Sequence, residues 1–400
     1  MSKRVAILGS TGSIGRNALR VIEALNSSLQ EGQRGQYEIV ALSANSSFEL
    51  LAEQARRYKP RYIAITNEDY ARQLGESVGD LDIEVLSGPE ALAQIAQLED
   101  IDVVLTAVVG VVGLDAILAA AKKGKRLAIA NKEPLVVAGQ LLTKTARENG
   151  AEILPVDSEH SAIFQALQAG CADEVERIIL TSSGGPFRQT RFEDIENATV
   201  EQVLSHPVWS MGPKITVDSA TMMNKALEVI EAHWLFGVEV EKIEVLIHPE
   251  SIVHSFVEFI DGSVVAQMAA PDMCLPIQYA LTYPSRVAGI AKRLEMDELS
   301  RLTFEKPDLG RFRALSLGYD VARAGGTAAA VFNAANEAAV GEFLAGRIKF
   351  INIVELIEDC LNKHNVKTGA NLQELLDADA WARDQVKKSI SRHQRKSTKV

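Results

Sequence analysis

The sequence predicts an α/β protein in three parts: an N-terminal parallel sheet covered by helices, a central α+β domain and a C-terminal helical domain. Three observations carry this prediction. Short apolar runs alternate with amphipathic segments over residues 1–156, longer strands with a hairpin follow, and helix-forming patterns dominate from residue 310. Strand–helix repetition with continuously apolar strands is typical of a parallel sheet buried on both faces.

Length and composition narrow the function classes. The chain has 400 residues, more than one core usually organises, and its hydrophobic content of 47% is that of an ordinary globular protein. A net charge of −11 disfavours an extended nucleic-acid surface. The three cysteines (Cys171, Cys274, Cys360) form no CxxC pair, and the apolar run 103–114 is too short to cross a membrane. We expect a cytoplasmic protein without nucleic-acid or membrane partners.

The N-terminal elements follow from these apolar runs. Strands are expected at residues 4–8, 37–44, 62–65, 102–109, 126–130 and 151–156. Helical patterns fill the intervals, for example at residues 14–24, 48–57 and 114–122. The polar stretch 27–36 indicates a surface loop.

The second half changes character. Strands are expected at residues 176–183, 244–248, 253–260 and 263–268, and helices at 327–344 and 351–363. Asp261-Gly262 between two alternating runs is a hairpin signal. The predicted divisions are 1–156, a catalytic domain 157–284, a linker 285–309 and a helical domain 310–400.

A glycine-rich turn, GSTGSIG at residues 9–15, follows the first strand and opens a helix. Its glycines permit a tight turn close to a pyrophosphate, and the helix N-terminus offers free N–H groups, as in a Rossmann-type dinucleotide site. A purely structural turn is the alternative. The second strand ends in Ala44, Asn45 and Ser46 without a carboxylate for a ribose hydroxyl, which favours NADP over NAD.

Asn131, Lys132 and Glu133 end another predicted strand, and strand C-termini in such sheets border the ligand crevice. Lys132 can bind an oxyanion or hydroxyl, while Asn131 and Glu133 can contact a nicotinamide ribose. Without the other motifs, a solvated turn is the simpler interpretation of the tetrapeptide 130–133.

Three carboxylates indicate a metal site. Asp157 and Glu159 stand one residue apart, and Glu228 shares one side of a predicted helix with Asn224 and Lys225. Oxygen ligands without histidine or cysteine clusters favour Mg²⁺ or Mn²⁺ over zinc. The alternative is a salt-bridged helix surface.

Hydroxyl-bearing loops indicate an anion site. Ser183 lies in the stretch TSSGGP, and Ser219 precedes the helix that carries Lys225. Hydroxyls, glycine amides and one ammonium can bind a phosphate. A plain loop and a helix cap are the alternatives.

The stretch 205–214, HPVWSMGPK preceded by Ser205, is too rich in proline and glycine for regular structure. Its apolar side chains are typical of a lid that closes over a ligand, although Trp209 in a static loop is equally compatible. His160 and His254 lie near apolar patterns, so we expect structural roles for them.

Together these motifs resemble the family of 1-deoxy-D-xylulose 5-phosphate reductoisomerases over nearly the whole chain. The matching stretches are GSTGSIG, ANKE, PVDSEHSAIFQ, SGGPFR, HPVWSMGPKITVDSATMMNKALEVIEAHWLF and HPESIVHS. The resemblance implies NADPH- and metal-dependent conversion of 1-deoxy-D-xylulose 5-phosphate to 2-C-methyl-D-erythritol 4-phosphate in the methylerythritol phosphate pathway of isoprenoid biosynthesis. It also implies a homodimer and a phosphosugar substrate.

The resemblance assigns roles to individual residues. Metal ligands would be Asp157, Glu159 and Glu228; Lys132, Glu159 and Glu228 would be catalytic; substrate contacts would be Lys132, Ser158, Glu159, Ser183, His206, Ser219, Asn224, Lys225 and Glu228. NADPH contacts would be Thr11, Gly12, Ser13, Ile14, Ala44, Asn45, Ser46, Asn131, Glu133 and Gly212. Trp209 and Met211 would belong to the flap.

Two other functions remain compatible with the motifs. One is an NADP-dependent dehydrogenase without isomerase activity, which would work without metal. The other is a nucleotide sensor that binds NADPH without turnover, against which the carboxylate set and the lid argue. Cys274 stands where the family often has arginine, and we expect no catalytic consequence.

Overall fold

The computed structural model describes residues 2–27, 37–205, 209 and 211–397, and the chain forms two compact units. Unit 1 comprises Met1–Pro134, Leu142–Ser161 and Asp272–Arg293; unit 2 comprises Leu135–Leu141, Ala162–Pro271 and Leu294–Val400. The finer domain boundaries expected from the sequence stay a prediction. Residues 28–36, most of the expected surface loop, lie outside the described residues.

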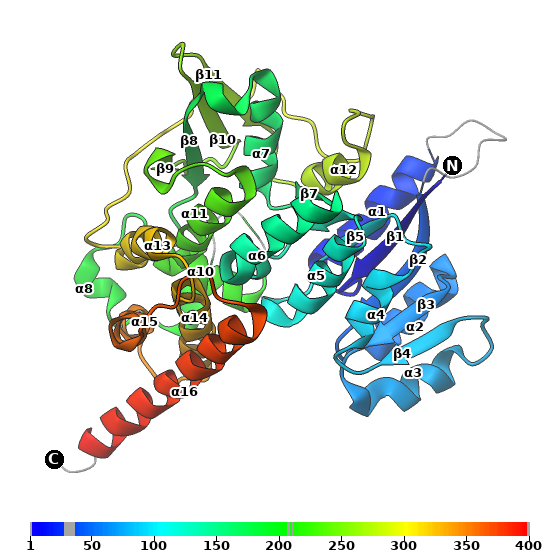
Figure 1. Ribbon diagram of the computed structural model, residues 1–400. Helices are drawn as coiled ribbons and strands as arrows, with labels where there is room; N and C mark the ends of the chain where they lie inside the picture. The colour runs from blue at the N-terminus through cyan, green and yellow to red at the C-terminus, as the bar shows by residue number, and fades with distance from the viewer. Residues whose placement is uncertain (1, 28–36, 206–208, 210, 398–400) are drawn as a thin grey trace. The chain divides into compact units, whose positions relative to one another are not determined.

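Unit 1 is built on a seven-stranded parallel sheet of order β4-β3-β2-β1-β5-β6-β7, with helices packed on it (Figure 1). Its strands are β1 (Lys3–Leu8), β2 (Tyr37–Ala44), β3 (Tyr62–Ile65), β4 (Glu84–Ser87), β5 (Val103–Thr106), β6 (Arg126–Ile129) and β7 (Glu152–Pro155). The predicted α/β class is confirmed. The order reverses between β1 and β5, which is where ligands bind in such sheets.

The helices of unit 1 cover the sheet. They are α1 (Ser13–Ser27), α2 (Phe48–Tyr58), α3 (Ala71–Val78), α4 (Ala91–Gln97), α5 (Leu114–Lys122) and α12 (Cys274–Thr282), with the 3₁₀ turns η1 (Glu68–Tyr70) and η2 (Gly110–Gly113). Helices α6 (Glu133–Asn149) and α7 (Ser158–Ala166) contribute residues to both units. The sequence does not predict β4, because this edge strand is partly exposed and lacks a continuous apolar run.

Unit 2 contains a four-stranded sheet of order β11-β10-β8-β9. Its strands are β8 (Val175–Ser182), β9 (Ile243–Ile247), β10 (Val253–Phe259) and β11 (Val264–Met268). β8 and β9 are parallel, whereas the other two pairs are antiparallel. The predicted Asp261-Gly262 hairpin therefore joins β10 to β11.

Helices make up the rest of unit 2. They are α8 (Phe192–Ile195), α9 (Val200–Val203), α10 (Pro213–Thr221), α11 (Met223–Phe236), α13 (Arg313–Ala324), α14 (Ala328–Leu344), α15 (Asn352–Lys363) and α16 (Leu372–Ser397), with the 3₁₀ turns η3 (Leu167–Ala169), η4 (Ala172–Glu174) and η5 (Val240–Lys242). α14 is the centre of the C-terminal bundle and contacts α13, α15 and α16. No described helix combines the length and apolar character of a membrane span.

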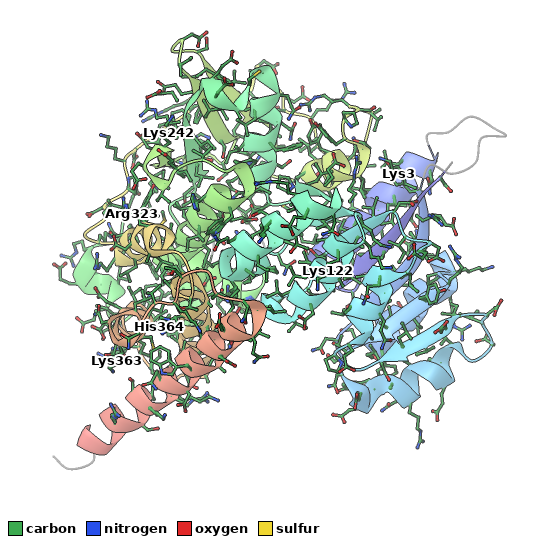
Figure 2. The ribbon with its side chains drawn as sticks, viewed as in Figure 1. Lys3, Lys122, Lys242, Arg323, Lys363 and His364 are labelled. Carbon is green, nitrogen blue, oxygen red and sulfur yellow. The ribbon has the colours of Figure 1, made fainter. Side chains whose placement is uncertain are left out.

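Surface charges of unit 2 also fix local structure. Arg323 on α13 pairs with Glu241 at 2.9 Å, and Lys242 donates to the carbonyl of Val175 at 3.2 Å (Figure 2). Both contacts hold η5 against its neighbours. Exposed pairs of this kind contribute little to stability individually.

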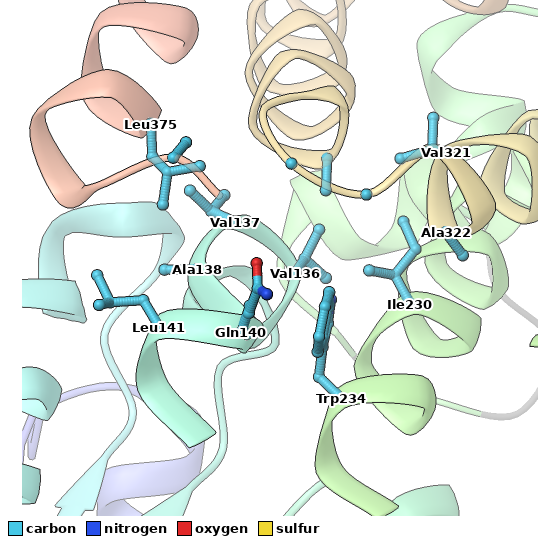
Figure 3. Close-up of a pocket in the computed structure, with 15 residues that line it drawn as sticks. Val136, Val137, Ala138, Gln140, Leu141, Ile230, Trp234, Val321, Ala322 and Leu375 are labelled. Atoms are coloured by element: carbon cyan, nitrogen blue, oxygen red, sulfur yellow. The ribbon is translucent and has the colours of Figure 1, made fainter. Parts of the chain in front are cut away.

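A small cavity lies beside a kink in α6. Ala138 leaves helical geometry (φ −130°, ψ 27°), and Trp234 of α11 lies next to the kink (Figure 3). The cavity has a volume of about 20 Å³ and is lined mainly by apolar side chains of α6, α11 and α13. It can hold about one water molecule and is too small for a phosphosugar or a dinucleotide.

Candidate functional site

The glycine-rich turn of unit 1 is held from behind by β2. The amide of Gly9 donates to Ser43 Oγ at 2.9 Å, and that of Ser10 donates to the carbonyl of Ser43 at 2.8 Å. Ser10 Oγ bonds Gln54 Oε1 at 2.6 Å, and all three polar side chains are buried. Ser43 and Gln54 are supports that sequence reasoning missed.

The tip of this turn stays accessible while its base is tightly packed. Residues 11–14 are exposed or half-buried, whereas a Cβ on Gly15 would lie 2.3 Å from the carbonyl oxygen of Gly9. The first turn of α1 has no acidic residue. The turn therefore offers an anion an approachable helix N-terminus.

The end of β2 carries no carboxylate that could bind a ribose hydroxyl, as the sequence indicates. Ala44 is buried, while Asn45 and Ser46 are exposed. Asn45 Oδ1 accepts a hydrogen bond from Thr66 Oγ1 at 2.9 Å, which orients its amide. Small neutral groups thus line this strand end.

The ends of β6 and β7 bring two predicted residues together. These strands are parallel neighbours, so the residues that follow them meet at one edge of the sheet. Lys132 Nζ lies 2.5 Å from Asp157 Oδ2, and both side chains are largely buried. Nearby, Ser158 Oγ donates to Glu159 Oε2 at 2.7 Å, where α7 begins.

Electrostatics keep Asp157 ionised. Burial opposes the charge, but the positive charges of Lys132 and His160 outweigh it and lower the pKa of Asp157 well below its usual range. His160 is fully buried. A ring nitrogen of His160 lies within 4.8 Å of a carboxylate oxygen of Asp157, a proximity that goes beyond the structural role expected from the sequence and that its position three residues later could have suggested.

Asn131 carries a buried acceptor. Its Nδ2 donates to the carbonyl of Gly110 at 3.3 Å, while its Oδ1 has no hydrogen-bond partner among the described residues. Buried polar atoms are rarely left in this state. Glu133, which begins α6, is also buried.

In unit 2, the start of α11 concentrates charge inside the protein. Glu228 is 0% exposed and Lys225 is 2% exposed, and the two form an ion pair. Asn224 Nδ2 also donates to Glu228. The structure therefore brings these three predicted residues together on one helix face.

The junction between α10 and α11 is strained. Met222 has φ +63°, an uncommon conformation for a non-glycine residue, and ends one helix where the next begins. Asp218, buried on α10, pairs with Lys214 at 2.8 Å and accepts from Asn336 Nδ2 at 2.9 Å. Sequence reasoning missed Asp218, although Lys214 precedes it by four residues on the same helix.

Only one of the two hydroxyl loops expected from the sequence is a loop: Ser183 follows β8, whereas Ser219 lies in the last turn of α10 and does not cap α11, whose N-cap is Met222. The two segments lie in contact. Gly185 has φ +67°, and a Cβ there would be only 2.5 Å from the carbonyl oxygen of Ser219. The Gly185 amide donates to Ser183 Oγ at 3.4 Å. The loop after β8 is thus pressed against α10 beside Ser219.

Part of the predicted site cannot be placed. His206 lies outside the described residues, as do 207–208 and 210, so the flap stays a prediction. The expected absence of regular structure up to residue 214 is wrong at its end, because Pro213 and Lys214 begin α10, where a proline in the first turn needs no backbone N–H donor. Gly212 precedes α10 in an extended conformation and accepts a hydrogen bond from Thr216 Oγ1 at 3.0 Å. A second cavity, of about 190 Å³, is lined by parts of α8, α10 and α15 and contains none of the predicted residues.

Family models match three stretches of the chain. Residues 5–139 match the 1-deoxy-D-xylulose 5-phosphate reductoisomerase model, 153–236 match the model of its C-terminal domain, and 268–385 match a further DXP reductoisomerase C-terminal domain. The stretches contain the nucleotide turn, the carboxylates and the hydroxyl loops described above.

Curated relatives and solved structures agree over nearly the full length. The 1-deoxy-D-xylulose 5-phosphate reductoisomerases of Agathobacter rectalis and Chlorobium chlorochromatii are 47% and 48% identical, covering 96% of this chain and 99% of each relative. The Zymomonas mobilis enzyme in complex with NADPH has a TM-score of 0.90 at 40% identity, covering 98% of this chain and 99% of that one. A DOX-P reductoisomerase complex with NADPH, fosmidomycin and magnesium has a TM-score of 0.91 at 41% identity, covering 97% and 98%. The chain belongs to the 1-deoxy-D-xylulose 5-phosphate reductoisomerase family.

Proposed function

We propose that the chain catalyses the NADPH- and divalent-metal-dependent rearrangement and reduction of 1-deoxy-D-xylulose 5-phosphate to 2-C-methyl-D-erythritol 4-phosphate, in isoprenoid biosynthesis. The observation that carries the proposal is the match to reductoisomerases along nearly the entire chain. The alternative of a dehydrogenase without isomerase activity is not favoured, because the matching models cover every residue proposed for the metal, substrate and cofactor sites.

Asp157, Glu159 and Glu228 would hold the metal ion. Their donors are all carboxylate oxygens, Asp157 is kept ionised by neighbouring positive charge, and Glu228 is fully buried, which suits a hard cation such as Mg²⁺ or Mn²⁺. When bound, the ion supplies Lewis acidity toward the ketone and hydroxyl oxygens of the substrate.

NADPH would bind unit 1 at the glycine-rich turn and the strand ends. Residues 11–14 would receive the pyrophosphate, and 44–46 the 2′-phosphate. The Oδ1 of Asn131, which has no hydrogen-bond partner among the described residues, is an acceptor for a hydroxyl or carboxamide donor of the nicotinamide end, and Glu133 follows two positions later. Gly212 would complete the contact from the flap. Neutral residues after β2 support NADPH over NADH.

The substrate phosphate would bind in unit 2. We call residues 183–190 the phosphate loop. In this proposal its Ser183 hydroxyl and glycine amides bind the substrate phosphate. The other contacts to the phosphate would come from Ser219, Asn224, Lys225 and His206. The packing of Gly185 on Ser219 supports it, since the loop after β8 and the end of α10 then lie in one place. Lys225 would neutralise part of the phosphate charge.

The chain's own residues would act on the reacting carbons as follows. Lys132, oriented by Asp157, donates a hydrogen bond to the substrate oxygen on which negative charge develops. Glu159, which accepts from Ser158, takes or returns the hydroxyl proton while one carbon–carbon bond breaks and another forms. One hydride from NADPH and one proton reduce the branched aldehyde to the alcohol. Phosphate binding far from these carbons positions them for reaction.

The assembly and location rest on the same resemblance. We propose a homodimer acting on a small phosphosugar; light scattering of the purified protein checks the oligomer, and a monomer under assay conditions contradicts it. A cytoplasmic location stays a prediction.

The activity test mixes purified protein with 1-deoxy-D-xylulose 5-phosphate, NADPH and Mg²⁺ and follows NADPH absorbance, with EDTA as the control. We expect metal-dependent oxidation and a branched polyol phosphate as product. Oxidation that persists in EDTA without a branched product would indicate a dehydrogenase. NADPH binding without turnover would indicate a nucleotide sensor.

A further inference from the structure

The stretch that leads into the C-terminal bundle is fixed to the small sheet of unit 2. We call residues 303–311 the strap. The amide of Glu305 donates to the carbonyl of Ile247 at 2.9 Å, and the amide of Ile247 donates back to Glu305 at 2.8 Å, which extends the sheet beyond β9. At the other end, Asp308 Oδ1 accepts the two backbone amides of Gly310 and Arg311 at 3.0 Å each.

A buried histidine turn holds the start of the strap. His248 Nε2 accepts two amides of the following turn (252–253) at 3.1 Å each, so its Nδ1 carries the proton and donates to the carbonyl of Thr303 at 2.9 Å. Glu250 accepts from the Thr303 amide and hydroxyl at 3.1 and 2.7 Å. His248 also stacks on Phe304, with ring centroids 4.6 Å apart. The strap therefore leaves the sheet in a fixed direction.

The far end of the strap binds the phosphate loop through one side chain. Arg311 donates to the backbone carbonyls of Phe187, Arg188 and Thr190, the second at 3.2 Å. Backbone carbonyls in a loop have no strand or helix partner and need such donors when water is excluded. A single guanidinium thus fixes three points of this loop.

A second contact reinforces the first. Glu305 pairs with Arg188 at 3.1 Å, and Arg188 Cδ lies 2.8 Å from where a Cβ on Gly184 would stand. The next residue, Gly185, packs on Ser219. The contacts run from the strap through the phosphate loop to α10 without a gap.

We infer that Arg311 is a positioning residue for the substrate phosphate: it touches no substrate atom but fixes the loop that presents Ser183 and the glycine amides. The inference rests on the proposed phosphate site. Lysine should replace it only in part, because an ammonium is a point charge whereas the guanidinium fork reaches several acceptors in fixed directions. Arg313, two residues later, is the matched control, since among the described residues its guanidinium bonds Glu358 on α15 and not the phosphate loop.

The test compares Arg311→Ala, Arg311→Lys and Arg313→Ala in the full-length enzyme. The readouts are the KM for 1-deoxy-D-xylulose 5-phosphate, the inhibition constant of inorganic phosphate against it, and the KM for NADPH. For Arg311→Ala we expect both phosphate-dependent constants to rise about tenfold and the NADPH constant to stay unchanged. Arg311→Lys, which keeps the charge and secures the test should the alanine variant not fold, should show a smaller rise of the same kind.

The contrary outcomes distinguish a failure of the Arg311 role from a failure of the proposed phosphate site. The role of Arg311 is overturned if the KM for 1-deoxy-D-xylulose 5-phosphate and the inhibition constant of phosphate are unchanged in both Arg311 variants. It is also overturned if these constants and the KM for NADPH change equally, or if Arg313→Ala raises the phosphate-dependent constants as much as Arg311→Ala does. Ser183→Ala is measured alongside. If it raises the phosphate constant and Arg311 variants do not, only the positioning role fails; if neither does, the proposed phosphate site fails with it.

Discussion

Replacement of Gly185 by alanine should disable the phosphate loop without unfolding the protein. Gly185 has φ +67°, and an added Cβ would lie 2.5 Å from the carbonyl oxygen of Ser219 and 3.1 Å from its carbonyl carbon. These atoms are backbone of α10, so they cannot rotate away as a side chain can. The loop itself has to move.

The chain contains a control that separates strain from collision. Gly237, at the end of α11, has φ +66° but nothing within 4 Å of its virtual Cβ. Alanine costs about 1 kcal/mol in this left-handed conformation, and both variants carry that cost. Only Gly185→Ala adds the overlap, whose relief requires a loop shift of roughly 1 Å. A shift of that size at a positioning element lowers kcat/KM about 100-fold.

The assay is NADPH oxidation with varied 1-deoxy-D-xylulose 5-phosphate, together with urea unfolding of both variants. We expect Gly237→Ala to keep wild-type kcat/KM while its unfolding free energy falls by about 1 kcal/mol. For Gly185→Ala we expect kcat/KM to fall about 100-fold, a loss that its lower unfolding free energy does not explain. Equal kcat/KM in the two variants would refute the idea that the contact with Ser219 places the phosphate loop.

Three further perturbations follow from the geometry. Glu228→Gln should raise the Mg²⁺ concentration for half-maximal activity roughly tenfold and lower kcat; a magnesium titration with unchanged kinetics would remove Glu228 from the site. Asn336→Ala leaves a carboxylate oxygen of buried Asp218 without its amide donor, so the unfolding free energy should fall by about 1–3 kcal/mol in urea, and an unaltered midpoint would contradict this. Burial raises the pKa of Cys274 and of Cys360 to about 11 from 9.0. Both thiols then ionise earlier in the unfolded chain, and stability present below pH 9 is lost as the pH rises toward 11; a Cys274→Ala, Cys360→Ala double variant should lose less over that range.

The sequence predicts the sheet of unit 1 well because its strands are buried on both faces. Such strands read as continuous apolar runs, and the glycine turn after the first one fixes the register of strand, turn and helix. The sequence does not predict β4, because this edge strand has exposed and half-exposed residues and therefore neither an apolar run nor a clear alternation. The kink at Ala138 is not predicted either: Gly139 follows it, but an isolated glycine inside a helical pattern does not by itself indicate a kink.

In the candidate site, the ligand-contacting residues are predicted from the sequence, whereas the residues that support them are not. The groups proposed to touch ligands lie in short motifs, because a strand end or one helix face can present several of them at once: Lys132 beside Asp157 follows from two adjacent strand ends, and Asn224 beside Glu228 from helical spacing. Local spacing therefore suffices to find them. It does not single out His160, because a lone histidine within an apolar helical pattern is expected to have a structural role.

The residues that hold those motifs in place come from far along the chain. Asn336 reaches Asp218 across 118 positions, and Arg311 reaches the carbonyls of the phosphate loop across more than 120. Their partners are backbone atoms or a carboxylate outside the ligand-contacting set, so neither residue type nor spacing marks them. A buried hydrogen bond of this kind exists only because two distant elements pack together, and the packing is a property of the fold. Further positioning residues of this enzyme should therefore be sought among long-range side-chain bonds onto the backbone of the motifs, ahead of the motifs' own neighbours in sequence.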